Sequence, residues 1–259
     1  MTLWQWILAL TALLFAAGPL ASLASSEVDL QADWRTADRT STGLAPDPAT
    51  TPEAVLQVYA ARAFSWRGIL GVHSWIAIKP ANATEFTVYQ IIGWHRFYGR
   101  PTLSVEEGPP DRRWYGHTPA ILLDIRGERA EALIGKTEAA IRAYPYATYR
   151  LWPGPNSNTF TAYVGRRVPE MGLALPPTAI GKDFLTNHAV FGPAPSGTGR
   201  QFSLFGLFGA LYGKKEGFEL NFMGLVIGFD PLNPAILLPG VGRIGLSGAN
   251  GAKTSPAGG

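Results

Sequence analysis

Residues 71–92, GVHSWIAIKPANATEFTVYQII, contain two alternating stretches with a polar turn between them. Apolar and polar side chains alternate in GVHSWIAI (71–78) and again in EFTVYQII (85–92), and alternation with a period of two is typical of β-strands. The KPAN sequence (79–82) has the composition of a turn. The stretch therefore predicts an antiparallel β-hairpin.

The hairpin would bring a histidine and a glutamine together. With the turn centred between residues 79 and 84, antiparallel pairing sets His73 across from about Gln90, with Tyr89 and Ile91 as register errors. The apolar neighbours of His73 would keep its imidazole neutral and able to act as a base, and Gln90 would orient the ring. The plainer alternatives are a hydrogen-bonded structural histidine and an exposed strand glutamine.

The middle of the chain predicts a strand, a helix and a second helix. AILLDI (120–125) has the pattern of a strand, and residues 127–144 follow as a helix that Pro145 ends. The apolar face of this helix would consist of Ala130, Leu133, Ile134, Thr137 and Ile141. YATYRLW (146–152) favours an extended segment, and the tight turn PGP (153–155) leads into a helix that ends near Val168.

Ser157 stands where that second helix begins. Backbone amides without helical partners and the helix dipole favour negative charge there, so amides near Asn158 could stabilise an oxyanion. A serine hydroxyl needs a base to become a nucleophile, and His73 is the candidate. The predicted site therefore has Ser157 as nucleophile, His73 as base and Gln90 as orienting residue, with a cleft formed by Asn156, Asn158 and Trp152. The alternative is that Asn156 or Ser157 only caps the helix.

The N-terminus predicts a membrane-entering segment. WQWILALTALLFAAGPLASLA (4–24) carries no charge and is nearly long enough to span a bilayer. The small-x-small pattern at residues 22–24 fits a signal-peptide cleavage site, although a basic region before it is missing. A cleaved signal peptide and a retained anchor both fit residues 1–24, and a buried core helix is a third interpretation.

Residues 25–50 are polar and rich in turn-forming residues, which predicts a linker between the membrane segment and one globular domain over residues 51–246. Pro52 resembles a helix start, and Ala54, Val58 and Ala61 recur on one face of a short helix that would end near Phe64.

The last third is glycine-laced and apolar. FSLFGLFGALYG (202–213) and GFELNFMGLVIGF (217–229) predict buried or lipid-facing strands joined by the charged turn 214–216. Lys182 and Asp183 fit a solvated loop better than a site lining. Residues 247–259 predict a flexible tail.

Composition excludes several classes of function. The net charge of +3 and the scattered lysines and arginines give no basic stripe for nucleic acid. Zero cysteines exclude disulfides and a thiolate nucleophile. The sequence contains no phosphate-binding or dinucleotide motif and no metal-ligand spacing, so we expect neither a cofactor nor a metal. The low charged fraction of 16% makes contact with lipid or a partner plausible, and a lipid, acyl or cell-wall ligand fits that surface.

The order of the predicted site residues is a histidine on one strand, a polar residue on the next, and a nucleophile at a later helix start. This order resembles circularly permuted papain-like proteins, which include lecithin retinol acyltransferase and cell-wall-directed amidases. Their nucleophile is a cysteine, often beside an asparagine; PNSNTF (155–160) is similar but has Ser157 in that position. The resemblance implies an α+β fold with an antiparallel sheet packed on helices, and hydrolysis or acyl transfer on an amide or ester.

Several longer segments lie between about Trp34 and Leu246: ADRTSTGLAPDP, VYAARAFSWRGILGVHSWIAIKP, AYPYATYRLWPGPNSNTF, LPPTAIGKDF, APSGTG and LPGVGRIGL. They resemble an uncharacterised bacterial family catalogued as domain of unknown function 3750. This resemblance implies a bacterial envelope protein, anchored in the inner membrane facing the periplasm or secreted to it. Two functions follow as expectations: a serine-dependent hydrolase or acyltransferase, or a non-catalytic binding module with a degenerate papain-like site.

Overall fold

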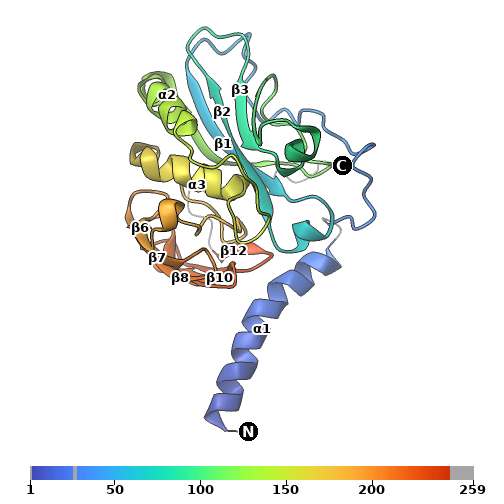
Figure 1. The fold of residues 1–259 in the computed structure, drawn as a ribbon, viewed down its shortest axis with the longest axis vertical. Helices are drawn as coiled ribbons and strands as arrows, with labels where there is room; N and C mark the ends of the chain where they lie inside the picture. Colours follow the sequence, from blue (N-terminus) through green and yellow to red (C-terminus); the bar gives the residue numbers. More distant parts are fainter. Residues whose placement is uncertain (1, 26–27, 246–259) are drawn as a thin grey trace.

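The chain forms two antiparallel sheets, the first from strands within residues 55–126 and the second from strands within residues 191–245. The apolar N-terminal segment forms a separate helix (Figure 1). The structure is a computed structural model that describes residues 2–25 and 28–245. The predicted α+β class is confirmed. The predicted tail, residues 247–259, lies outside the described residues.

The first sheet has five strands in the order β4-β3-β2-β1-β5. Its strands are β1 (Val55–Arg62), β2 (Val72–Lys79), β3 (Thr87–Ile91), β4 (Leu103–Glu107) and β5 (Ala120–Arg126). Two helices, α2 (Gly127–Arg142) and α3 (Ser157–Arg167), pack on one face of this sheet. The main apolar core fills the space between them, and a smaller core cluster lies on the opposite face.

Short 3-10 helices connect several of these elements within the described residues. They are η1 (Ser65–Ile69), η2 (Gly93–Tyr98), η3 (Pro169–Met171) and η4 (Thr186–His188). The predicted inner face of α2 is confirmed, because all five of its predicted residues are buried. Residues 146–152, expected to be extended, form no regular strand.

The predicted hairpin is confirmed as β2 and β3, which pair antiparallel. The register differs from the prediction by two residues: Ile76 pairs with Tyr89, which puts Gln90 at the level of Trp75 instead of His73. The turn is longer than a minimal hairpin, so its centre could not be fixed from its composition. Residues 73, 75 and 90 still share one face, because side chains two apart on a strand point the same way.

The short helix predicted over residues 52–64 is wrong, because this segment is strand β1. The segment lies between β2 and β5, and Val55, Leu56, Val58 and Tyr59 are fully buried. A central strand covered on both faces is apolar nearly throughout and loses its alternation. The helical spacing of Ala54, Val58 and Ala61 was therefore a coincidence within a continuous apolar run.

Part of the predicted linker belongs to the fold. The buried carboxylate of Asp111 accepts hydrogen bonds from the Ser41 hydroxyl at 2.7 Å and from the Leu44 amide at 2.7 Å. The Arg113 amide donates to the Thr40 carbonyl at 2.9 Å. Residues 40–45 thus lie against the loop that follows β4, so this part of residues 25–50 belongs to the fold.

The second sheet is a meander of seven strands in sequential order, confirming strands on both sides of the charged turn. Each glycine-laced run contributes a hairpin, not one strand. The strands are β6 (Phe191–Pro193), β7 (Gly199–Leu204), β8 (Phe208–Gly213), β9 (Gly217–Phe222), β10 (Leu225–Asp230), β11 (Ala235–Leu238) and β12 (Gly242–Gly245).

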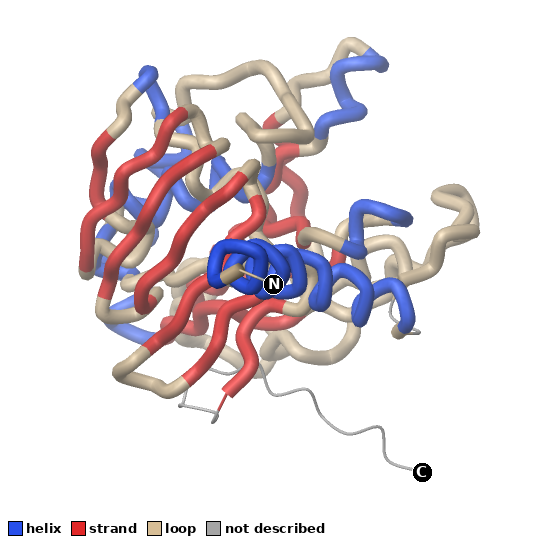
Figure 2. Tube along the Cα trace, turned by 90° about the horizontal axis from the view of Figure 1, so that it is seen from below, coloured by secondary structure: helices blue, strands red, loops and turns tan. Residues whose placement is uncertain are grey.

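The N-terminal helix α1 (Leu3–Ala24) projects away from the rest of the molecule (Figure 1). It is long and apolar enough to cross a membrane, and only 11% of its most apolar 18-residue stretch is buried within the protein. Its C-terminal part packs on the protein: the Ser22 hydroxyl donates to the Gly240 carbonyl at 2.9 Å. Seen from below in Figure 2, strands of the second sheet lie beside this helix.

Candidate functional site

The start of α3 is held by Asn156, which is the N-cap residue. Its side-chain oxygen accepts from the amides of Asn158 at 3.0 Å and Thr159 at 3.1 Å. Its side-chain nitrogen donates to the carbonyls of Leu151 and Ile180, both at 3.0 Å. Asn156 therefore closes the helix end and ties it to two loops, as the capping alternative expected.

Asn158 connects the same helix end to β2. Its side-chain nitrogen donates to the carbonyls of Val72 and Ile180, both at 2.9 Å. The Ser74 hydroxyl lies 2.8 Å from the Asn158 side-chain oxygen and 2.9 Å from the Thr161 hydroxyl. These groups are buried and satisfied by one another, so the polar side chains beside Ser157 bind the protein itself.

His73 lies on the other side of the sheet. Neighbouring residues of a strand point to opposite faces, and Ser74 points toward α3. His73 points into the second cluster, where its ring stacks on that of Trp114 with the centroids 3.7 Å apart. The predicted pairing of Ser157 with His73 is therefore not formed, since the body of the sheet separates their side chains.

The expected contact between His73 and Gln90 is present. His73 Nε2 and Gln90 Oε1 are 2.9 Å apart. An amide oxygen only accepts, so Nε2 carries the proton. Burial lowers the pKa of His73 to about 4, against the opposing effect of the hydrogen bond to Gln90. The imidazole is thus neutral, but it supports an aromatic cluster and does not face the serine.

The last predicted cleft residue, Trp152, ties the loop before α3 to the second sheet. Its indole nitrogen donates to the Met223 carbonyl, in the turn between β9 and β10, at 2.8 Å. Ser157 itself is 5% exposed, and no hydrogen bond of its hydroxyl is found among the described residues. The predicted set thus divides into a structural helix cap and a separate histidine–glutamine pair.

A pocket of about 260 Å³ opens over the histidine–glutamine pair, on the sheet face opposite α2 and α3. We call it the aromatic pocket. Its lining consists of Arg39, Trp75, Val88, Gln90, Ile92, Trp94, His95, Glu106, Glu107, Pro109, Pro110, Arg112, Arg113, Trp114 and Tyr115. Aromatic rings with a few converging polar groups are the usual lining of a small-molecule site.

The aromatic rings hold one another in place. Trp114 lies 5.7 Å from Trp94 and is perpendicular to Tyr115, with an interplanar angle of 87°. The indole nitrogen of Trp75 donates to the Pro110 carbonyl at 2.7 Å, which fixes the floor. Trp94 remains 39% exposed at the rim, so part of its side chain is accessible to a ligand.

Charged groups of both signs surround these rings. The guanidinium of Arg39 lies 4.3 Å from the Tyr115 ring centroid, a cation–π arrangement. Arg113 forms an ion pair with Asp38 at 3.1 Å, and Glu106 accepts from the Ser104 hydroxyl at 2.6 Å. The pocket can therefore offer planar apolar surface together with charged donors and carboxylate acceptors.

The sequence hypothesis missed most of this pocket. The feature of the sequence that could have indicated the pocket is the recurrence of aromatic and basic residues in two turn-like stretches, GWHRFYGR (93–100) and RRWYGH (112–117). Aromatic residues in turns are not required for a core, and large exposed rings mark binding surfaces. Only proximity in space unites the two stretches with the histidine–glutamine pair.

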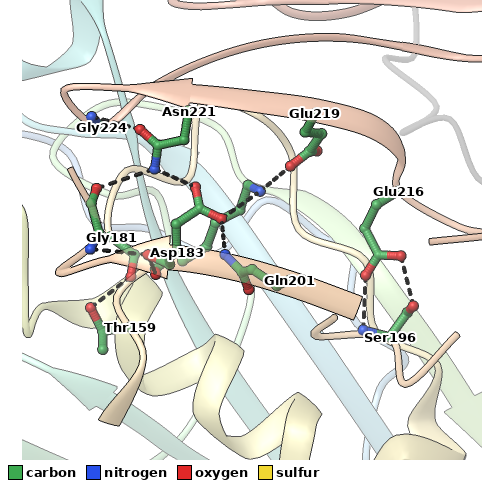
Figure 3. Close-up of polar contacts among 12 residues, drawn as sticks. Thr159, Gly181, Asp183, Ser196, Gln201, Glu216, Glu219, Asn221 and Gly224 are labelled. Atoms are coloured by element: carbon green, nitrogen blue, oxygen red, sulfur yellow. Dashed lines mark hydrogen bonds and ion pairs between the residues drawn. The ribbon is translucent and has the colours of Figure 1, made fainter. Parts of the chain in front are cut away.

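A second polar cluster lies between α3 and the inner face of the seven-stranded sheet (Figure 3). Lys182 forms ion pairs with Asp183 and Glu219, and all three are at most 4% exposed. The Asp183 carboxylate also accepts from the side-chain amides of Gln201 and Asn221. Lys182 and Asp183, expected in a solvated loop, are thus buried because the second sheet covers them.

The electrostatics of this cluster follow from its burial. Burial raises the pKa of Glu219 to about 7, although the charge of Lys182 opposes the rise. Burial lowers the pKa of Arg166 to about 10, and Asp183 and Glu216 oppose that change. Glu216 is itself buried and accepts from the Ser196 amide and hydroxyl. Because its members satisfy one another away from solvent, the cluster joins the second sheet to α3.

The fold and the pocket together define a class: an α+β protein with an apolar N-terminal helix, two antiparallel sheets and an aromatic pocket on one of them. The chain belongs to the family described as "Protein of unknown function (DUF3750)", whose model matches residues 53–184. The matched region contains the five-stranded sheet, α2, α3 and nearly the whole pocket lining; β6–β12 lie outside it.

No curated protein and no solved structure matches the chain. The resemblance to permuted papain-like proteins therefore has no support among known structures, and the papain-like core is not confirmed. The opposite orientations of His73 and Ser74 are the structural reason why its catalytic arrangement is missing.

Proposed function

We propose that this protein is a membrane-attached, non-catalytic binding module of the cell envelope that holds an acidic cell-wall saccharide in the aromatic pocket. The observation that carries the proposal is the exposed Trp94 beside Trp114, in a pocket also lined by Arg39, Gln90 and Glu106. A pyranose ring has an apolar face that stacks on indole and hydroxyl groups that bind carboxylates and amides. Arginine recognises a carboxylate on the sugar.

The attachment to the membrane rests on α1. The helix has the length and composition of a membrane span, and its C-terminal end packs closely on the protein. At Gly18, an added Cβ atom would meet the Pro239 carbonyl oxygen at 1.9 Å. A segment fitted this closely to the folded protein favours a retained anchor over a cleaved signal peptide.

Binding can be measured on the full chain in detergent, with the disaccharide of N-acetylglucosamine and N-acetylmuramic acid as the probe and tryptophan fluorescence as the readout. We expect Trp94→Ala to weaken binding at least about tenfold, as for an aromatic anchor. Trp66→Ala is the matched control, because Trp66 is 52% exposed and lies outside the pocket. Equal affinity of the two variants, or no binding by the unmodified chain, would exclude the proposal.

The neutral dimer of N-acetylglucosamine separates stacking from charge recognition. It shares the apolar ring faces but lacks the lactyl carboxylate. We expect it to bind more weakly than the acidic disaccharide, and we expect Arg39→Gln to remove that difference. Preferential binding of the neutral sugar would contradict the acidic specificity and leave a pocket that selects only ring shape.

The competing function, a serine-dependent hydrolase or acyltransferase, makes a separate prediction. Its base would have to be a group other than His73, whose ring faces Trp114. A serine-directed fluorophosphonate probe should leave Ser157 unlabelled under the binding hypothesis. Labelling that disappears in Ser157→Ala would show an activated serine and overturn the non-catalytic assignment.

A further inference from the structure

The seven-stranded sheet carries a polar cluster on its covered face and apolar side chains on its open face. The side chains that point inward from β7, β9 and β10 are largely polar and at most 8% exposed: Gln201, Ser203, Glu219, Asn221 and Asp230. The side chains that alternate with them point outward and, apart from Arg200 at the border, are apolar. An antiparallel sheet with one covered face normally shows the opposite pattern, with apolar residues inside and polar residues in water.

The outward side chains form continuous rows across the strands. We call them the outer face, and the register of the sheet orders them in three rows. One row is Tyr212, Phe218, Phe229, Ile236 and Ile244; the next is Phe191, Phe202, Ala210, Leu220 and Ile227; the third is Leu204, Phe208, Phe222 and Leu225.

This face is open among the described residues. Tyr212 is 60% exposed, Phe229 53% and Ile236 56%, although all three lie within regular strands. No member of the three rows carries a charge, and Arg200 lies at the border, opposite Tyr212. Exposed apolar surfaces of this extent mark contact with a membrane or a partner, not contact with water.

The position of α1 favours a membrane over a protein partner, because this apolar helix packs on the same outer face. The ring of Phe15 packs edge-on against Phe222 of the outer face, with the centroids 5.8 Å apart. The helix also meets the turn between β11 and β12, where Ser22 donates to Gly240. α1 contacts β10 and β11 of this sheet, and Figure 2 shows strands beside the helix.

We propose that the outer face of the seven-stranded sheet rests on the lipid bilayer into which α1 inserts. A helix that spans the bilayer and packs on this sheet brings the apolar rows to the membrane surface. Tyrosine rings are favoured at the membrane–water interface, phenylalanine and leucine side chains can enter the boundary of the acyl chains, and Arg200 at the border can reach the headgroups. The inference is independent of the saccharide proposed for the aromatic pocket.

The absence of cysteine from the sequence makes a direct test possible. Single cysteines at Phe229 and, separately, Ile236 can carry a nitroxide label in the full chain reconstituted into vesicles of neutral and anionic phospholipids. Val105→Cys is the matched control, because Val105 is an equally exposed strand residue, 54% exposed, on the other sheet. Accessibility to oxygen reports lipid, and accessibility to a water-soluble nickel chelate reports water.

We expect labels at Phe229 and Ile236 to be several-fold more accessible to oxygen than to the nickel chelate, and the label at Val105 to show the reverse. Outer-face labels that match the Val105 label would overturn the proposal. Labels protected from both reagents would also overturn it, because a second copy of the chain or another protein would then cover the face. Two positions are used so that the result does not depend on one substitution.

Discussion

The ring of Trp114 lies parallel to that of His73, with centroids 3.7 Å apart and an interplanar angle of 8°. On its edge, His73 binds Gln90 at 2.9 Å, so both the plane and the rotation of the imidazole are fixed. Trp114 in turn packs against Trp94 and Tyr115, which also line the aromatic pocket. His73 therefore has a positioning role beneath the pocket, which requires the neutral form of its ring.

This role predicts a pH dependence of stability. The pKa of His73 falls by burial from 6.5 to about 4 in the folded protein, so the unfolded chain binds more protons between these values. Stability therefore rises with pH across this window, and acidification from 6.5 to 4 should remove about 3 kcal/mol. Urea unfolding of the full chain in detergent, measured at several pH values, gives the slope.

The control is His73→Gln, which keeps a hydrogen-bonding group toward Gln90 and cannot titrate. We expect the unfolding free energy of this variant to change less between pH 6.5 and 4 than that of the unmodified chain. The slopes of the two proteins must be subtracted, because protonation of Glu219 stabilises the folded state as the pH falls and offsets the effect of His73 in both. Identical slopes for the two proteins would show that His73 is accessible to protons in the folded state.

The elements of the fold were predictable wherever one residue pattern had one structural meaning. The β2–β3 hairpin and helices α2 and α3 follow from alternation, helical spacing and an N-cap asparagine. The pattern misled at β1, because a strand buried on both faces has no alternation to distinguish it from a helix. The reversed polarity of β9 was visible in GFELNF (217–222), but its direction depends on what covers the sheet.

The site was less predictable for a geometric reason. Alternation places His73 and Ser74 on opposite faces, but the sequence does not say which face α3 will cover. One residue of difference thus separates a possible catalytic pair from two unrelated sites. The aromatic pocket combines residues from four distant segments, and no local pattern reports that kind of proximity.

The buried cation Lys182 should be essential for stability. Lys182→Met leaves the buried carboxylates of Asp183 and Glu219 without their cationic partner, so we expect a loss of about 3–5 kcal/mol at pH 8. Lys136→Met is the matched control: Lys136 also forms an ion pair, with Glu170, but on the surface, so its loss should be nearly neutral. Urea unfolding measures both.

The same variant should respond to pH in a defined direction. The pKa of Glu219 is raised by burial to about 7 in the folded protein, above its ordinary value of 4.5. The folded state therefore binds more protons than the unfolded chain between these values, and stability gains as the pH falls through 7. In Lys182→Met the opposing charge of Lys182 is gone and the pKa of Glu219 rises further, so the variant gains more stability on acidification than the unmodified chain. We therefore expect the penalty of Lys182→Met to be smaller at pH 5.5 than at pH 8. An equal penalty would mean that Glu219 remains charged.

Asn156 and Ser157 are adjacent at the start of α3 but should contribute differently to stability. Asn156→Ala removes the acceptor of two helix amides and two buried hydrogen bonds to loops, so we expect a loss of about 2–4 kcal/mol. Ser157→Ala should change the unfolding free energy by less than about 0.5 kcal/mol, because removing a hydroxyl that makes no hydrogen bond with the described residues leaves no buried partner unsatisfied. Comparable losses for the two variants would indicate a hydrogen bond to the Ser157 hydroxyl.

The seating of α1 on the second sheet depends on the missing side chain of Gly18. An added Cβ atom would lie 1.9 Å from the Pro239 carbonyl oxygen and 3.5 Å from Val241, so Gly18→Val should push the helix off the β11–β12 turn. Cysteines placed at Phe15 and Phe222, whose rings are 5.8 Å apart, report this contact by oxidative cross-linking in membranes. We expect several-fold less cross-linking in Gly18→Val.

Ala16→Val, on an exposed side of the same helix, should cross-link normally, because the added volume meets only lipid. Undiminished cross-linking in Gly18→Val would mean that the helix and the sheet do not share the packed contact on which the orientation of the outer face depends.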